Sequence, residues 1–250
     1  MKNEIILWLS SILILFLIGY IKNVTDKNYP ITGTFGIEGK KVSFKLDKVS
    51  FDKKSYKNII ISDVKGITGK LIQIEDDEQS EISFKEIERG LECEIPKLKP
   101  GQNIKYKIIL NYSDRIYEIP EKEFVTLTFW GNVPSPVNIL HFILLYGGLL
   151  ISLRSLLELF NNNKNLKKYA VITCTLFITL MTIIAPLQNS YKLGAINKYV
   201  PQVTDLLEPV LLIILLIWIA GTIFIFNKKY MRKVTIIVVV VTIVLFFFLR

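Results

Sequence analysis

Five apolar stretches, separated by one long polar insert and shorter polar connections, constrain this chain more than any other feature of its sequence. The first stretch lies within residues 1–21. The other four follow the insert, at about 137–157, 169–187, 210–226 and 234–249. A helix needs about 20 apolar residues to cross a hydrocarbon core roughly 30 Å thick, and each stretch is near that length. The sequence therefore predicts a multi-pass membrane protein with five transmembrane helices.

Lysine and arginine side chains gather in two of the connections between these stretches. The first group comprises Arg154, near the end of the second stretch, with Lys164, Lys167 and Lys168 after it. The second group comprises Lys228, Lys229, Arg232 and Lys233. Cytoplasmic loops of membrane proteins collect lysine and arginine, so both connections are expected inside. This orientation in the cytoplasmic (inner) membrane places the N-terminus inside, and the insert and the C-terminus outside.

The formal net charge of +9 comes mainly from the last part of the chain. Residues 137–250 hold eleven lysine or arginine residues and three acidic ones, whereas residues 21–136 are close to neutral. A basic chain often binds nucleic acid, but here the charge lies beside predicted membrane helices. We therefore expect the lipid bilayer as a partner, with anionic headgroups at the two basic loops, and no nucleic acid.

The first apolar stretch fits two roles. A short charged start followed by an apolar run is also the pattern of a cleaved secretory signal. However, Gly19 is followed by Tyr20 and Ile21, where a signal peptidase requires small side chains, and no cysteine is present for lipid attachment. We favour an uncleaved signal-anchor over residues 1–21, and both alternatives export the insert.

Residues 28–132 are predicted to form one extracytoplasmic β domain. Apolar and polar residues alternate in 41–46 and 104–108, as they do in strands with one buried face. Turn residues, such as the Lys-Pro-Gly-Gln of 99–102, separate these runs. About seven short strands at this spacing favour an all-β sandwich.

The segment from Leu98 to Tyr106 resembles the turn and following strand of fibronectin type III and immunoglobulin-like domains. A leucine, a Pro-Gly turn and a tyrosine that bonds back to the backbone recur there, although the gap between leucine and tyrosine is longer here. The resemblance implies a mixed fold, in which an immunoglobulin-like sandwich is inserted after the first transmembrane helix. An all-α bundle of four transmembrane helices, 137–250, follows it.

The insert offers few groups for catalysis or cofactor binding. It holds no histidine and one cysteine, Cys93, so it cannot form a zinc cluster or a Cys–His nucleophile. The acidic run 75–78 lacks the glycine spacing of calcium loops, so we expect a solvated hairpin tip. Cys174 lies in a predicted span, and no disulfide with Cys93 is expected. We therefore expect no cofactor.

The membrane half contains the candidate cluster for function or packing: His141, Arg154, Glu158, Tyr191, Lys192, Asp205 and Glu208. Arg154 and Glu158 are one helical turn apart, which is the spacing of an ion pair whose arginine extends toward the inner headgroups. His141 lies about 20 Å from Arg154 along the same helix, so the two cannot share a site. His141 with Asp205 and Glu208 would instead form an outer site, although both carboxylates also suit the start of a helix.

Glycine and serine residues in the second stretch predict close helix packing. Gly147, Gly148 and Ser152 give this helix a face of small side chains. Small residues at such spacing let neighbouring helices approach closely in a membrane.

Several segments together resemble a family of uncharacterised bacterial membrane proteins. They are 34–43, 133–141 with Ser152 and Arg154, and 185–186 with Tyr191 and Gly194. The resemblance implies an N-terminal anchor, an exported β domain and four further spans, and it brings no activity.

The short inner connections decide between classes of function. Residues 158–168 and 227–233 fall far below the roughly 50 residues of a small domain, which excludes a cytoplasmic kinase, nucleotide-binding or DNA-binding domain there. We expect a non-catalytic binding or complex-assembly module whose partners are other membrane or extracytoplasmic proteins. The alternative is a membrane-embedded enzyme or transporter built on His141, Asp205 and Glu208.

Overall fold

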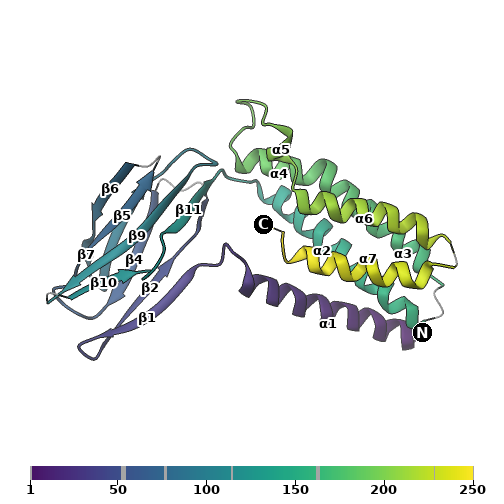
Figure 1. Cartoon of the computed structure of the whole chain (residues 1–250), viewed down its shortest axis with the longest axis horizontal. Helices are drawn as coiled ribbons and strands as arrows, with labels where there is room; N and C mark the ends of the chain where they lie inside the picture. The colour runs from purple at the N-terminus through teal and green to yellow at the C-terminus, as the bar shows by residue number, and fades with distance from the viewer. Residues whose placement is uncertain are drawn as a thin grey trace. The chain divides into compact units, whose positions relative to one another are not determined.

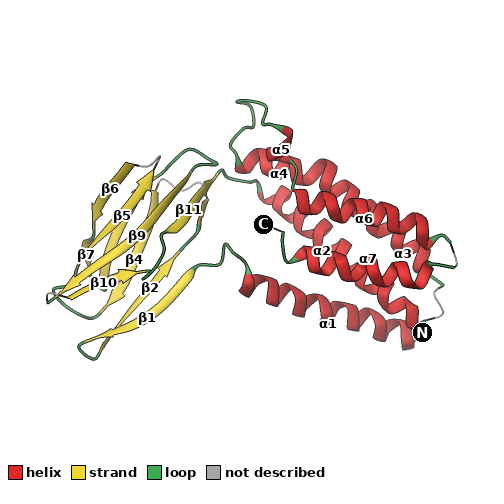
Figure 2. Cartoon of the chain, viewed as in Figure 1, coloured by secondary structure: helices red, strands yellow, loops and turns green. Residues whose placement is uncertain are grey.

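An N-terminal helix, a β-rich region of two sheets and a helical C-terminal region follow one another along the chain (Figures 1 and 2). The structure, a computed structural model, describes residues 2–51, 55–75, 78–113, 115–161, 164–227 and 229–249. Two compact units are present: Met1–Lys27 with Val133–Tyr191 and Ala195–Arg250, and Asn28–Asn132 with Lys192–Gly194. The mixed fold and the order of its parts were predicted from the sequence and are confirmed.

The helices of the first unit are α1 (Lys2–Thr25), α2 (Ser135–Leu157), α3 (Leu166–Thr179), α4 (Ala185–Lys192), α5 (Val203–Leu206), α6 (Pro209–Ile225) and α7 (Met231–Phe246). Among the described residues, three helical segments are long and apolar enough to cross a membrane: Asn3–Thr25, Ser135–Phe160 and Leu166–Lys192. The fourth and fifth predicted spans correspond to α6 and α7, which are shorter helices of 17 and 16 residues.

Prolines explain where several helices begin or change. Pro186 has no N–H to donate and its ring crowds the preceding turn. The chain accommodates it with a π-helical turn, η2 (Leu180–Ile184), which joins α3 to α4 in one continuous helix. Pro209 begins α6, and the residue before it, Glu208, has the extended backbone that proline imposes (φ −85°, ψ 113°).

The N-terminal helix is an integral part of the helical unit. Near the end of α1, Lys22 Nζ donates a hydrogen bond of 2.6 Å to the carbonyl of Leu249, just beyond α7. Helices α6 and α7 are joined by a bond of 2.9 Å from Trp218 Nε1 to Thr242 Oγ1. The small face of α2 packs closely as predicted, since a Cβ added at Gly148 would lie 2.9 Å from the Phe177 ring of α3.

The second unit contains two sheets. The first has the strand order β1 (Ile31–Ile37), β2 (Lys40–Leu46), β4 (Ser55–Ser62), β8 (Gly90–Pro96) and β7 (Lys85–Ile87). The second has the order β3 (Val49–Phe51), β11 (Val125–Trp130), β9 (Asn103–Tyr112), β5 (Thr68–Glu75) and β6 (Glu78–Ser83), and β10 (Arg115–Ile119) also pairs with β9. All described strand pairs are antiparallel except β3 with β11. Asp76 and Asp77 of the acidic run lie outside the described residues.

One hydrophobic core is shared by both sheets. Val42, Leu46 and Ile60 of the first sheet and Leu71 and Leu127 of the second belong to the same buried cluster, each at most 1% exposed. The alternation in the sequence produces this arrangement, because every second residue of a strand faces the same side. The strands therefore bury an apolar face between the sheets. Their outer side is mixed, because it carries exposed lysines such as Lys45 and also the exposed Ile59 and Ile61 of β4.

Two tyrosines clamp the connection between β2 and β3. Tyr106 of β9 donates a hydrogen bond of 2.9 Å to the Asp47 carbonyl, and the Asp47 N–H donates one of 3.0 Å to the Tyr56 hydroxyl of β4. The Tyr106 hydroxyl thus reaches a backbone group 59 residues upstream. The tyrosine therefore bonds back to the backbone, as the resemblance to fibronectin and immunoglobulin domains implied, and this bond ties both sheets to one corner.

Candidate functional site

A fully enclosed ion pair lies at the end of α2. Arg154 Nη1 is 2.6 Å from Glu158 Oε2, and both side chains have no exposed surface. Glu158 Oε1 also accepts a hydrogen bond of 3.2 Å from the Asn165 N–H, at the start of α3. The remaining guanidinium nitrogens, Nε and Nη2, have no hydrogen-bond partner among the described residues.

Aromatic rings from two other helices surround the guanidinium group. The Arg154 Cζ atom lies 5.6 Å from the centre of the Trp8 ring of α1 and 5.0 Å from that of Tyr169 of α3. The two rings meet edge to face, with centroids 6.1 Å apart. A cation beside such rings is attracted by their electron-rich faces, and this contribution grows when the cation is removed from water. The site therefore joins α1, α2 and α3.

The predicted spacing of Arg154 and Glu158 does form an ion pair, but the arginine does not extend outward to headgroups. Its enclosure follows from Trp8, whose role has no signal in the local sequence around Arg154. Burying two charges costs several kcal/mol per ion unless they are paired, so the pair, the rings and the Asn165 N–H depend on one another. Such an arrangement suits helix assembly, because the described structure leaves no exposed surface of either charge for a substrate.

The opposite end of the helical unit contains two buried carboxamides, Gln188 and Asn189, that sequence reasoning did not identify. Gln188 Nε2 of α4 donates a hydrogen bond of 2.9 Å to Asn138 Oδ1 of α2, and Asn189 Nδ2 donates one of 3.0 Å to the Leu206 carbonyl. Gln188 and Asn189 are 7% and 9% exposed. Uncharged polar residues within an apolar helix are the sequence signal that would have found them.

The other predicted residues lie in different settings. His141 is half-buried in α2. Tyr191 and Lys192 are the last residues of α4, beyond the end of the predicted span 169–187. Asp205 is exposed in α5, and Glu208 occupies the N-cap position of α6 without a side-chain cap. The expectation that Asp205 and Glu208 begin the same helix is wrong, because Pro209 forces an extended residue between α5 and α6.

No group of three or more His, Cys, Asp or Glu side chains suited to a metal ion occurs among the described residues. Cys93 and Cys174 are both free thiols. Burial raises the pKa of the Cys93 thiol to about 11, which disfavours the reactive thiolate at neutral pH.

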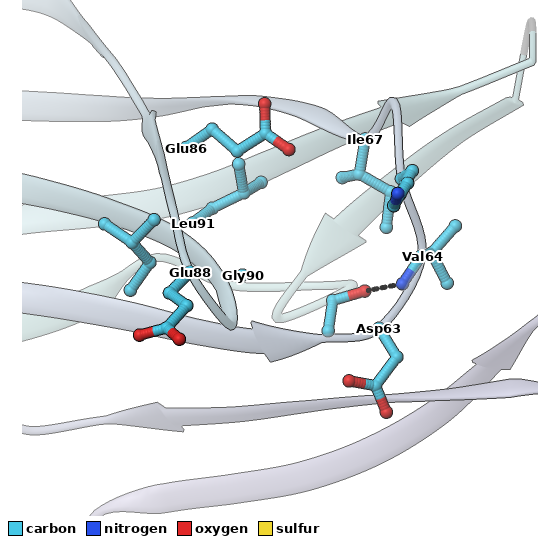
Figure 3. A pocket seen from close by; sticks show the side chains of 10 residues that line it. Asp63, Val64, Ile67, Glu86, Glu88, Gly90 and Leu91 are labelled. Carbon is cyan, nitrogen blue, oxygen red and sulfur yellow. Dashed lines mark hydrogen bonds between the residues drawn. The ribbon is translucent and has the colours of Figure 1, made fainter.

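An open pocket of the β unit lies near the turn between β7 and β8 (Figure 3). Its volume is about 230 Å³, and Asp63, Lys65, Glu86 and Glu88 contribute charged side chains to it. Figure 3 shows the three carboxylates pointing in different directions. The dashed bond in that view is the 3.1 Å hydrogen bond from the Val64 N–H to Ser62 Oγ, which holds the β4–β5 connection.

Basic side chains of the predicted inner connections gather at the helix ends. Lys167 Nζ, in the first turn of α3, lies 5.0 Å from the centre of the Phe226 ring at the end of α6. Lys229 Nζ lies 5.4 Å from the Tyr230 ring just before α7. Lys228 lies outside the described residues. The start of α3 and the end of α6 therefore share one end of the helical unit.

Comparisons with protein-family models, with curated proteins and with solved structures found no match. The resemblance to a bacterial membrane-protein family thus gains no support from them, and the order of apolar helix, two-sheet β region and apolar helices rests on the structure.

Proposed function

We propose that this chain is an integral protein of the cytoplasmic membrane, with an immunoglobulin-like sandwich on the outer side that acts as a non-catalytic binding or complex-assembly module. In this proposal α1, α2, the continuous α3–α4 helix, α6 and α7 cross the membrane. The N-terminus is inside and the C-terminus outside. Other membrane or extracytoplasmic proteins are the partners, and anionic headgroups bind the inner basic loops.

The observation that carries this proposal is the separation of the chain into two units with different surfaces. The β unit buries one core between its sheets, and its exposed side chains include many charged ones and a few apolar ones, such as Ile59 and Ile61. The helical unit exposes large apolar side chains, among them Phe16, Phe142 and Ile223, each more than half exposed. Exposed apolar surface of that extent on long helices suits lipid, whereas a sandwich that closes its own core suits the aqueous side, where it can contact proteins.

Contacts between helix ends support the five-span orientation. Trp8 near the start of α1 meets Tyr169 near the start of α3, and Lys22 near the end of α1 meets Leu249 at the end of the chain. Helices that cross in alternating directions place these ends together. The end that holds Trp8 also holds the basic residues of the α2–α3 connection, as the rule for cytoplasmic loops requires.

The competing class is a membrane-embedded enzyme or transporter with an outer site. The buried carboxamides of Gln188 and Asn189 favour it, because polar groups within membrane helices often mark a pathway. His141, on the same helix as Asn138, would supply the one side chain whose ordinary pKa lies near neutral pH.

Two variants in the full chain separate the classes. His141→Gln and Asp205→Asn are compared with the unchanged protein for abundance, for partners that copurify after mild crosslinking, and for cellular phenotype. A binding module keeps its partners and its phenotype, since both changes alter local packing only modestly. A null phenotype with normal abundance and a normal complex would refute the binding module and favour the enzyme or transporter.

A further inference from the structure

The edge strands of the β unit differ sharply in how they are protected. An edge strand presents unpaired N–H and C=O groups, and natural proteins usually shield it by shortness or by charged side chains. Strands β3 and β7 have only three residues each. Strand β6 carries Glu78 and Glu81, and β10 carries Arg115 and Glu118. These four strands have the usual protection.

Strand β1 has none of it. It is seven residues long, with the sequence Ile-Thr-Gly-Thr-Phe-Gly-Ile, and contains no charged residue and no proline. Its described pairing is with β2 alone, at the margin of the first sheet (Figure 1). In an antiparallel pair, alternate residues direct both backbone groups away from the partner strand. Strand β1 therefore offers a regular row of donors and acceptors along its open side.

The inward side chains of β1 are also incompletely covered. Ile31 and Phe35 point toward the core but are only partly buried against it. Phe35 stacks on Tyr117 of β10, with ring centroids 5.4 Å apart. One further strand beside β1 would cover the remaining apolar surface of these inward side chains, which adds a hydrophobic contribution to the backbone hydrogen bonds.

We propose that β1 binds an extended segment of a partner protein, which joins the first sheet as an additional strand. Such strand addition gains affinity from main-chain hydrogen bonds and specificity from alternate side chains. This inference rests on the proposed binding function, because it assigns the surface of the β unit that the partner contacts.

The charge beside β1 defines the chemistry of the partner segment. On the outer face, Lys41 stands opposite Gly36 and Lys45 opposite Thr32, and both lysines are exposed. Gly36 has no side chain, and a Cβ placed there would meet nothing closer than 3.9 Å. The Lys41 side chain can therefore extend across Gly36 to the added strand. The partner segment alternates apolar residues, which face Phe35, with acidic residues, which face Lys41.

The same charge argues against pairing of β1 with a second copy of the chain. In such a pair the added strand would be a second β1, which contains no acidic residue to meet Lys41. A segment with glutamates on that face meets complementary charge.

The test uses the full chain in detergent or nanodiscs and a labelled nine-residue peptide that alternates valine and glutamate. We expect this peptide to bind and to slow hydrogen–deuterium exchange in Ile31–Ile37, while Glu78–Ser83 in β6 exchanges as before. Lys41→Glu should weaken binding about two- to fivefold, the size of one exposed ion pair. Lys105→Glu, the same charge change on an exposed position of the second sheet, should leave it unchanged.

Several outcomes would overturn the proposal. Equal binding of the same peptide carrying N-methyl groups on its central residues would show that backbone hydrogen bonds are not used. Protection of Ile31–Ile37 that needs no peptide and grows with protein concentration would assign the edge to a second copy. The peptide could also fail to bind while crosslinked partners still copurify with the Lys41→Glu variant. This result would reject β1 as the binding surface and leave the proposed function intact. If no protein copurifies with the unchanged chain after crosslinking, the proposed function is rejected instead.

Discussion

At the scale of single residues, Arg154 and Glu158 depend on each other for their burial. Removing one partner of an enclosed ion pair leaves an uncompensated charge, which typically costs about 3–5 kcal/mol, whereas apolar replacement of both is often nearly neutral. We expect Arg154→Met and Glu158→Met each to lower the unfolding temperature strongly, and the double variant to recover most of the loss. Thermal unfolding in detergent measures this.

The double variant also tests what the pair does. Partner copurification should be normal in it, because both charges are enclosed and contact only protein. A double variant as unstable as either single variant would show that the guanidinium contacts with Trp8 and Tyr169, rather than the ion pair, hold the helices.

The Tyr56–Asp47–Tyr106 clamp makes the β unit sensitive to alkaline pH. Burial raises the pKa of the Tyr56 hydroxyl to about 12, and burial raises that of Tyr106 as well. A tyrosine in the unfolded chain titrates near pH 10. The two buried, protonated hydroxyls therefore contribute fully to the free energy of unfolding below about pH 10, and this contribution is lost as the pH rises toward 12. Each tyrosine contributes a slope of about 1.4 kcal/mol per pH unit within that window.

We therefore expect Tyr56→Phe to flatten the decline in stability between about pH 10 and pH 12, although it lowers stability at neutral pH by removing the hydroxyl that accepts from the Asp47 N–H. Tyr29→Phe is the matched control, because Tyr29 is 46% exposed and should leave the decline unchanged. Denaturant unfolding at stepped pH, followed by circular dichroism at β-sheet wavelengths, measures both. If stability declines equally steeply with pH in the unchanged chain and in Tyr56→Phe, the Tyr56 hydroxyl is not a cause of the decline.

At the scale of elements, apolar length and alternation predicted most of the fold. The five apolar stretches correspond to α1, α2, the α3–α4 helix, α6 and α7, and the alternating runs correspond to strands. These signals are local, so they are visible in the sequence. The predicted ends of the helices were less accurate. Helical hydrogen bonding continues through the π turn before Pro186, so Tyr191 and Lys192 belong to α4.

The candidate site was predicted only where its residues are neighbours in sequence. Arg154 and Glu158 lie one turn apart, and this spacing was enough to anticipate their pairing. Trp8 lies 146 positions before Arg154, and the Tyr106 hydroxyl meets a carbonyl 59 residues away, so neither contact has a local signal. Contacts of this kind depend on how complete helices and sheets pack, which one sequence does not reveal.

Packing of α2 against α3 provides a test with a matched pair of glycines. A Cβ at Gly148 would lie 2.9 Å from the Phe177 ring, whereas one at Gly147 would lie 3.9 Å from Leu176, an ordinary contact. Gly148→Ala should therefore destabilise the helical unit by about 1–3 kcal/mol through overpacking, less the gain in helix propensity. Gly147→Ala should be neutral or slightly stabilising. Comparable losses in both variants, measured by thermal unfolding in detergent, would show that α2 and α3 do not pack through Gly148.

At the scale of the whole molecule, the function proposed here depends on the β unit lying outside. The two units alone do not determine this, because the same helices could cross in the opposite sense. The distribution of lysine and arginine breaks that symmetry. The orientation is therefore a property of the loops rather than of either core.

The orientation can be measured by thiol labelling of intact cells with a membrane-impermeant reagent. Lys198→Cys, at an exposed position between α4 and α5, should react, and Lys164→Cys, at an exposed position between α2 and α3, should react only after the membrane is opened. The native thiols give little background, because Cys93 is buried with its pKa raised to about 11 and Cys174 lies within α3. Labelling of Lys164→Cys from outside would invert the topology, place the β unit in the cytoplasm, and remove extracytoplasmic proteins as its partners.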